Sequence, residues 1–311
     1  MKQLQQLTGS GLKLGGIRPD ACVALFEQCA ISITSYAYGL CPPHSNRAEL
    51  LDETQVHFAN QFLGLPDDCH GDIGKSVLGL LDFQLRISRA RLLMLHRVAN
   101  NELDSLTNAM IKWPITPHGE SFINQCQQVL YELDTSVNIQ TLIDTPYIVA
   151  SYTLKLTVQS IQQKRWHDRA LLGPREVVRH ARALHHWGLD SALLYQSPDD
   201  ARNFIQFRAG VITAPESKSP ETGWPVCAVC LRANASLTHL LWQCKPLRTA
   251  RSYYLSSIPH RIHALIIRSH PDQAESIIMG GGGLISPGDW ETIRDQSVLF
   301  ISSVVQTVRN H

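Results

Sequence analysis

The sequence predicts an all-α protein, and three observations support this prediction. Apolar side chains recur every three or four positions over most of the 311 residues, which is the spacing of one face of a helix. Glycine and proline interrupt these segments, as they do where one helix ends and another begins. The composition, with 44% hydrophobic and 18% charged residues, is that of a globular protein large enough to bury its own core.

The N-terminal part predicts three helices that end at glycine or proline. Residues 1–40 form two of them, separated near Pro19, and the second is apolar on most sides. Residues 46–64 form the third, which ends at Gly64. A short polar loop, with the sequence LPDDCHGD, then separates this helix from the next.

The clearest helical pattern lies between Ile73 and Ala99, and we expect one continuous helix there. Its predicted apolar stripe consists of Leu80, Phe83, Ile87, Ala90, Met94 and Val98. An adjacent face carries three arginines, which are Arg86, Arg89 and Arg97. Arginines in this arrangement either contact phosphate groups or form a solvated helix face.

The remainder of the chain predicts a boundary near Trp113-Pro114 and then more helices. Their expected ranges are 118–135, 139–165, 199–210, 246–257, 261–269 and 289–308, with a flexible run at 280–283. The breaks between the predicted helices and the position of the predicted metal site divide the chain into four expected segments. Their ranges are 1–115, 116–220, 221–250 and 251–311.

The most basic stretch of the chain runs from Ile161 to Gly188. Its cationic side chains are Lys164, Arg165, Arg169, Arg175, Arg179 and Arg182, against two acidic ones. Trp166, His180 and Trp187 lie between them and suit a strand-binding surface, where aromatic rings stack on bases and arginines hold phosphates. The alternative is an amphipathic helix whose tryptophans belong to the core.

A set of cysteine and histidine residues near the C-terminus predicts a metal site. Cys227 and Cys230 are separated by two residues, and His239 and Cys244 by four. Four soft ligands without a carboxylate favour tetrahedral Zn²⁺, and a closed shell of this kind leaves no position for a catalytic water. We therefore expect a structural Cys-Cys-His-Cys zinc knuckle. The alternative is that these are buried thiols brought together by chance.

The surroundings of the knuckle are basic. Lys245 and Arg248 follow its last ligand closely, and Arg232 and Arg251 lie on either side of this part of the chain. These side chains allow a contact with RNA or DNA, although a knuckle can also serve only to hold two helices together.

Several classes of protein are excluded by what the sequence lacks. The formal net charge of +1 gives no overall attraction to polyanions, so a nucleic-acid contact must come from local patches. We find no signal peptide, no membrane-spanning run and no cysteine spacing typical of disulfides, and therefore expect an intracellular protein. There is also no metal-binding aspartate pair in a strand hairpin and no nuclease, phosphate-loop or hydrolase motif, so we expect no catalysis and no small-molecule substrate.

Four pieces in one order resemble a known family. They are GIRPDACVALFEQCAISITSYAYGL, FANQFLGLPDDCHGDIGKSVLGLLDFQLRISRARLLMLHRV, ARNFIQFRAGVITAP and CAVCLRANASLTHLLWQC. Together they are similar to the region after the palm in reverse transcriptases of non-LTR (LINE-like) retrotransposons. The matching residues are Leu63, Gly64, Leu65, Pro66, Leu78, Gly79, Leu80, Arg86, Ile87, Ala90, Leu95, Arg97, Phe207, Arg208 and Gly210.

The resemblance implies a helical thumb and connector, a zinc knuckle and a C-terminal helical tail. In that family these parts hold template RNA or target DNA during target-primed reverse transcription, which favours a nuclear location. The family's catalytic aspartates would lie before Met1, in palm and fingers that act as a partner of this region. The resemblance thus implies binding of zinc and nucleic acid without polymerisation. The alternative is a zinc-stabilised protein–protein adaptor, or a relic of an element, with no nucleic-acid activity.

Overall fold

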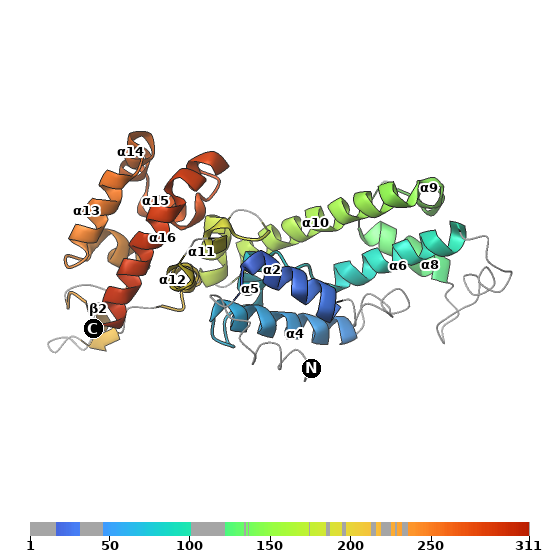
Figure 1. Cartoon of the computed structure of the whole chain (residues 1–311), viewed down its shortest axis with the longest axis horizontal. Helices are drawn as coiled ribbons and strands as arrows, with labels where there is room; N and C mark the ends of the chain where they lie inside the picture. The colour runs from blue at the N-terminus through green and yellow to red at the C-terminus, as the bar shows by residue number, and fades with distance from the viewer. Residues whose placement is uncertain are drawn as a thin grey trace. The chain divides into compact units, whose positions relative to one another are not determined.

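The computed structural model describes residues 17–31, 46–100, 122–133, 135, 137–173, 175–184, 187–194, 197–212, 216–218, 225–227, 229–231 and 236–310. Most of these residues are helical, which confirms the predicted all-α class (Figure 1). The chain divides into two compact units. Unit 1 comprises Met1–Val23, Gln55–Leu80 and Trp166–His311, and unit 2 comprises Ala24–Thr54 and Leu81–Arg165. Within the described part, no helix has the length and apolar character needed to cross a bilayer.

Three helices contribute residues to both units: α2 (Pro19–Leu25), α4 (Asn46–Leu63) and α10 (Tyr147–Leu172). Unit 2 further contains a π-helical turn, η1 (Phe26–Ile31), and the helices α6 (Phe83–Asn100), α8 (Phe122–Glu132) and α9 (Ile139–Asp144). Its core is a cluster of leucine, valine and phenylalanine side chains from α6, α8, α9 and α10.

Besides its parts of the shared helices, unit 1 contains α5 (Gly71–Leu78) and, after α10, α11 (Arg175–Leu184), the 3₁₀ turn η3 (Ser191–Leu194) and α12 (Pro198–Arg208). Two short strands follow, β1 (Glu216–Lys218) and β2 (Pro225–Cys227), and then the π-helical turn η4 (His239–Gln243). The chain ends in α13 (Arg248–Ser257), α14 (His260–Arg268), α15 (Pro271–Gly280) and α16 (Pro287–Arg309). Helix α16 packs against α12, α13 and α15, and Figure 1 shows it, in red, between α13 and α15.

The predicted continuous helix between Ile73 and Ala99 is wrong, because the chain breaks at Gly79. This residue caps α5 in the left-handed conformation, with φ +70°, where a side chain would be strained. A Cβ on it would also lie 3.0 Å from the backbone of Gly188, which passes beside it. Both the turn and this close approach require glycine.

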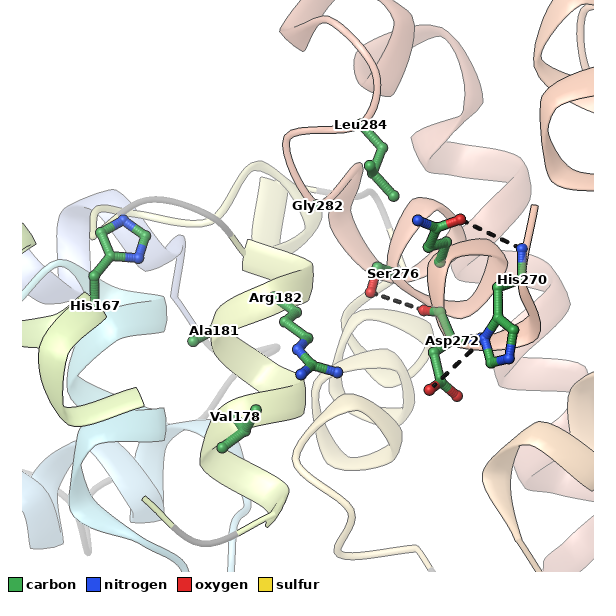
Figure 2. Close-up of a pocket in the computed structure, with 10 residues that line it drawn as sticks. His167, Val178, Ala181, Arg182, His270, Asp272, Ser276, Gly282 and Leu284 are labelled. Carbon is green, nitrogen blue, oxygen red and sulfur yellow. Dashed lines mark hydrogen bonds and ion pairs between the residues drawn. The ribbon is translucent and has the colours of Figure 1, made fainter. Parts of the chain in front are cut away.

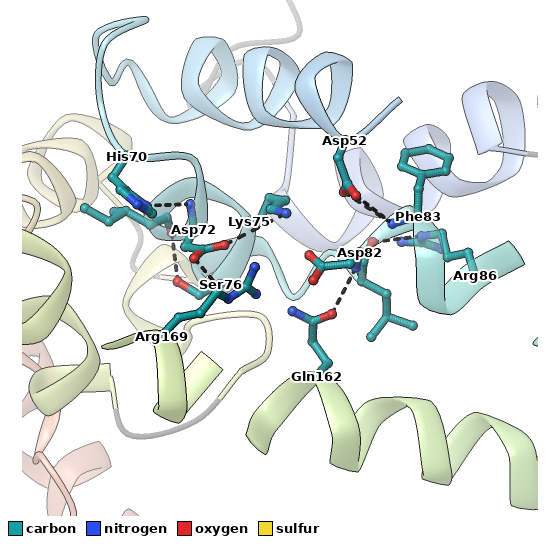
Figure 3. A network of polar contacts seen from close by, with 12 residues as sticks. Asp52, His70, Asp72, Lys75, Ser76, Asp82, Phe83, Arg86, Gln162 and Arg169 are labelled. Atoms are coloured by element: carbon teal, nitrogen blue, oxygen red, sulfur yellow. Dashed lines mark hydrogen bonds and ion pairs between the residues drawn. The ribbon is translucent and has the colours of Figure 1, made fainter. Parts of the chain in front are cut away.

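The predicted apolar stripe is also partly wrong, because the new start at Phe83 turns a different face inward. Helix α6 buries Leu85, Ser88, Arg91, Leu92 and Leu95, whereas Ala90, Met94 and Val98 are only half-buried. The start is fixed by Asp52, whose carboxylate oxygens both lie 3.2 Å from the Phe83 backbone N–H and accept its hydrogen bond (Figure 3).

A second predicted helix, at 139–165, is divided into α9 and α10. Pro146 has no N–H to donate and disfavours a helical conformation at Thr145, which is extended with ψ 136°. The helices expected at 46–64, 199–210, 246–257, 261–269 and 289–308 are confirmed within two residues at each end. Helix α15 was not predicted.

Some predictions lie outside the described residues. They are the helix before Pro19, the second half of the helix after it, and the boundary near Trp113-Pro114. The division into four segments stays a prediction.

The centre of unit 1 holds a buried ion pair between Arg208 of α12 and Asp190, the residue before η3. The Arg208 side chain is 0% exposed and that of Asp190 is 3% exposed. Arg208 also donates to the carbonyl oxygen of Met279 at 3.0 Å and lies over the ring of Phe204. Asp190 donates its backbone N–H to the carbonyl of Val77 at 2.9 Å. The pair therefore connects α5, α12 and α15.

We expect Arg208→Ala to destabilise unit 1 by about 3–5 kcal/mol, because it leaves the Asp190 carboxylate buried without its cation. Urea unfolding followed by tryptophan fluorescence measures the loss. A matched control is Arg202→Ala, which removes a partly exposed arginine paired with the exposed Asp199 and should cost less than about 1 kcal/mol. Equal losses for the two variants would contradict the role of the buried pair.

Candidate metal centre

A short hairpin positions the first two predicted ligands. Strands β1 and β2 pair antiparallel, with Glu216 opposite Cys227. The chain then turns back, because the backbone N–H of Leu231 donates to the carbonyl oxygen of Cys227 at 2.7 Å. Leu231 takes a left-handed conformation, with φ +58°, to close this turn. Cys227 and Cys230 therefore lie on one tight loop.

The π-helical turn η4 positions the other two ligands. The backbone N–H of Cys244 donates to the carbonyl of His239 at 2.8 Å, a bond that spans five residues. Ser236 fixes the start of the turn, because its hydroxyl accepts a hydrogen bond from the His239 N–H at 3.0 Å. Leu240 and Leu241 are fully buried and anchor the turn in unit 1.

The four predicted ligands converge on one point. One donor atom from each of Cys227, Cys230, His239 and Cys244 lies within 4.8 Å of every other, and Cys230 Sγ is 3.3 Å from His239 Nε2. Cys227 and Cys244 are 0% exposed, and His239 is 5% exposed. The prediction that these residues form one cluster is confirmed, and the cluster is suited to hold a metal ion.

Burial sets the protonation of the cluster in the metal-free protein. Burial, together with a smaller contribution from the neighbouring Cys227 and Cys230, raises the pKa of the Cys244 thiol to about 12. Burial lowers the pKa of His239, so its ring is neutral at pH 7 and retains a lone pair for a metal. Metal binding must therefore displace protons from sulfur.

Two residues outside the ligand set hold the cluster in place. Arg251 of α13 donates to the carbonyl oxygens of Leu241 and Cys244, the second at 3.1 Å. Thr238, next to the ligand His239, donates from its hydroxyl to Glu275 of α15 at 3.1 Å. The sequence identified Arg251 only as one of the basic residues near the knuckle. Neither Thr238 nor Glu275 could be identified from the sequence, since α15 was not predicted.

The predicted nucleic-acid residues of unit 2 are mostly engaged with protein groups. Arg86, labelled in Figure 3, pairs with Glu27 at 2.9 Å. It also donates to the Leu81 carbonyl. The remaining contacts are those of Arg89 with Ser151, Arg97 with the Tyr147 hydroxyl, and Arg165 with Gln84. Lys164 is exposed. These arginines thus hold helices together in the structure.

The predicted nucleic-acid residues of unit 1 divide into two groups. Arg169 lies 3.3 Å from the buried Asp72 carboxylate and so compensates an internal charge (Figure 3). Arg182, Lys245 and Arg248 are exposed. The side chain of Arg179 and the whole of Arg232 lie outside the described residues.

The aromatic residues of the basic stretch favour the structural interpretation. Trp166 and His180 are 0% exposed, and their rings meet edge to face at a centroid distance of 5.8 Å. His180 Nε2 also lies 3.1 Å from the buried Ser76 hydroxyl. Trp187 completes the group by contacting Trp166. A nucleobase cannot stack on the buried Trp166, so this part of the strand-binding hypothesis is not supported.

Comparison of the chain with protein-family models, with curated proteins and with solved structures gives no significant match.

We expect Cys230→Ser to abolish stoichiometric metal binding and to loosen the hairpin and η4, while the helices of unit 2 remain folded. The reason is that three remaining ligands leave an open shell, and the binding free energy of such a site is also local folding free energy. Metal analysis and hydrogen exchange measure the two effects. Stoichiometric metal retained by the variant would contradict the assignment of Cys230 as a ligand.

The apparent affinity for metal should rise with pH between about pH 6 and 8, by about two to three log units per pH unit, because up to three thiol protons are released on binding. Titration with Co²⁺, whose thiolate charge-transfer band reports binding, measures this slope. The exposed Cys29 provides the control: Cys29→Ser should leave the slope unchanged. An affinity independent of pH would show that the thiols are not the ligands.

Proposed function

We propose that the cluster binds Zn²⁺ and that the ion is structural. Three thiolates and one imidazole, with no carboxylate, form the ligand set that zinc knuckles use. Donor atoms about 2.0–2.3 Å from a tetrahedral zinc ion lie about 3.3–3.8 Å apart, so a contraction of at most about 1.5 Å accommodates the ion. Four protein ligands leave no open position for substrate or water, which supports a role in holding β2, η4 and α13 together.

We further propose that the region around the knuckle binds single-stranded nucleic acid. The segment from Lys245 to Pro271 contains five lysine or arginine residues and no acidic residue, although the whole chain carries a formal charge of only +1. Lys245 and Arg248 are exposed directly after the last ligand, and Tyr253 of α13 is 69% exposed. Cations with a nearby aromatic ring are the usual combination for holding a strand by its phosphates and bases.

The resemblance to the region after the palm of non-LTR retrotransposon reverse transcriptases supports the same function. On this proposal the chain is the non-catalytic thumb, connector and knuckle part of such a polymerase, which contacts template RNA or target DNA. Because such a polymerase acts on chromosomal DNA, the proposal favours a nuclear location. Polymerisation would require a palm supplied by other residues, and we do not propose it for this chain.

A second candidate is a zinc-stabilised protein–protein adaptor. Two observations favour it: the near-neutral formal charge, and the engagement of Arg86, Arg89, Arg97 and Arg165 in contacts within unit 2. The two candidates differ in their response to salt. Displacement of counterions from phosphates makes strand binding weaken steeply as salt rises, whereas an adaptor has no salt-sensitive affinity for RNA or DNA.

The purified chain should contain one Zn²⁺ and bind single-stranded RNA with an affinity that falls with salt. The variant with Lys245→Ala and Arg248→Ala should bind more weakly and show a log–log salt slope smaller by about two, because two phosphate contacts are lost. Fluorescence anisotropy over a salt series, together with metal analysis, measures both quantities.

A matched control is Arg261→Ala, which removes a cation of α14 that is already paired with Asp289. Its salt slope should equal that of the unchanged chain. One bound Zn²⁺ without any affinity for RNA or DNA would refute the nucleic-acid function and favour the adaptor.

A further inference from the structure

Unit 1 contains a cavity of about 550 Å³ that no part of the proposed knuckle function uses. It lies between α11 and α15 and is closed at one end by the glycine-rich turn after α15 (Figure 2). Its volume is within the range of pockets that hold small organic ligands. The lining is mixed, with apolar side chains from Val178, Ala181 and Leu284 beside charged and polar ones.

The α11 wall presents a cation. Figure 2 shows the Arg182 side chain extending from α11 across the cavity toward α15. Arg182 is exposed, and among the residues that the structure describes it has no hydrogen bond or ion pair. In this respect it differs from Arg86, Arg165 and Arg169, each of which already has a protein partner. A guanidinium with free donors is suited to hold a phosphate.

The α15 wall presents hydrogen-bond acceptors. The Asp272 carboxylate faces Arg182 across the cavity in Figure 2, and its only ion pair among the described residues is a long one of 3.9 Å to His270. This carboxylate can accept a hydrogen bond from an amino group of a ligand. The cavity therefore favours a ligand that is anionic at one end and a hydrogen-bond donor at the other, with some apolar surface to contact Val178, Ala181 and Leu284.

The glycine turn gives the cavity a fixed end. The backbone N–H of Gly282 donates to the carbonyl of Ala183 at 3.2 Å, which satisfies one of the last carbonyls of α11. Gly282 has φ +56°, and a Cβ on it would lie 2.8 Å from the carbonyl oxygen of Arg182. The turn is thus held against the helix that carries Arg182, so the backbone of Arg182 is fixed at the edge of the cavity.

The cavity also leads toward the knuckle. A second, smaller pocket shares Val178, Arg182, Asp272 and Ser276 with it and is lined on its far side by Ser236, Leu237 and Thr238. Thr238 precedes the ligand His239 and is bonded to Glu275 of α15. A strand lying on the knuckle could therefore place one of its nucleotides in the cavity.

We propose that this cavity binds a nucleoside monophosphate unit with an amino-bearing base, the phosphate on Arg182 and the base amino group on Asp272. The unit is either a free nucleotide or one nucleotide of a bound strand. Binding of a nucleotide that belongs to a strand rests on the proposed function, whereas binding of a free nucleotide is independent of it. Cytosine and uracil form the sharpest matched pair, because cytosine carries an amino donor where uracil carries a carbonyl acceptor.

The test is a calorimetric titration of the zinc-loaded full chain with CMP and with UMP. CMP should bind at least about fivefold more tightly than UMP. Arg182→Gln should weaken CMP binding about tenfold, since it removes a charged hydrogen bond to the phosphate. Asp272→Asn should remove the preference for CMP. The control is Arg261→Gln, outside the cavity and paired with Asp289, which should leave CMP binding unchanged; circular dichroism and metal content establish that each variant is folded.

Competition with single-stranded RNA distinguishes the two sources of the nucleotide. CMP that displaces the RNA, together with weaker RNA binding by Arg182→Gln, supports a nucleotide of the strand. CMP that binds without affecting the RNA supports a free nucleotide, and CMP binding in a chain with no affinity for RNA supports the cavity while refuting the proposed function. Absence of CMP binding, or CMP binding unchanged in Arg182→Gln, would overturn the proposal whatever the RNA result.

Discussion

The arrangement of unit 1 depends on one buried charge that must be paired. Arg208 has its guanidinium inside the protein, where an uncompensated cation is unstable, so Asp190 and the Met279 carbonyl have to be brought to it. These two partners are far apart in the sequence, since Asp190 precedes α12 and Met279 lies at the end of α15. Meeting this requirement positions α15, and α15 in turn contacts the knuckle through Glu275 and lines the cavity with Asp272.

The same electrostatic rule explains why basic residues are poor guides to a nucleic-acid surface. A run of arginines in the sequence does not distinguish side chains that face solvent from those that compensate buried acids. Arg169 pairs with Asp72, which is 5% exposed, and Arg86 pairs with Glu27 and donates to the carbonyl of Leu81, just before α6. Among the described residues, the exposed cations include Lys245 and Arg248 near the knuckle and Arg182 at the cavity.

Local chemistry was predictable from the sequence, and long-range contacts were not. The spacing of Cys227, Cys230, His239 and Cys244 identified the cluster because metal ligands constrain one another over a few residues. Most helices were predicted because periodicity and capping are local signals. The breaks at Gly79 and Pro146 were missed, the first because Gly188 approaches it from more than a hundred residues away. The buried His180 likewise has a distant partner, Ser76, which periodicity does not identify.

The discontinuous path of unit 1 has a consequence for how the chain folds during synthesis. Helix α5 and the segment before it leave the ribosome early, yet they pack against α11, which is made only after all of unit 2. The face of α5 that contacts α11 must therefore wait for its native partner while more than eighty further residues are translated, a period in which such a surface is exposed to aggregation. Unit 2 between them needs no residue beyond Arg165 and can form first. Chaperone dependence of the nascent chain should therefore be concentrated on the segment from Gln55 to Leu80.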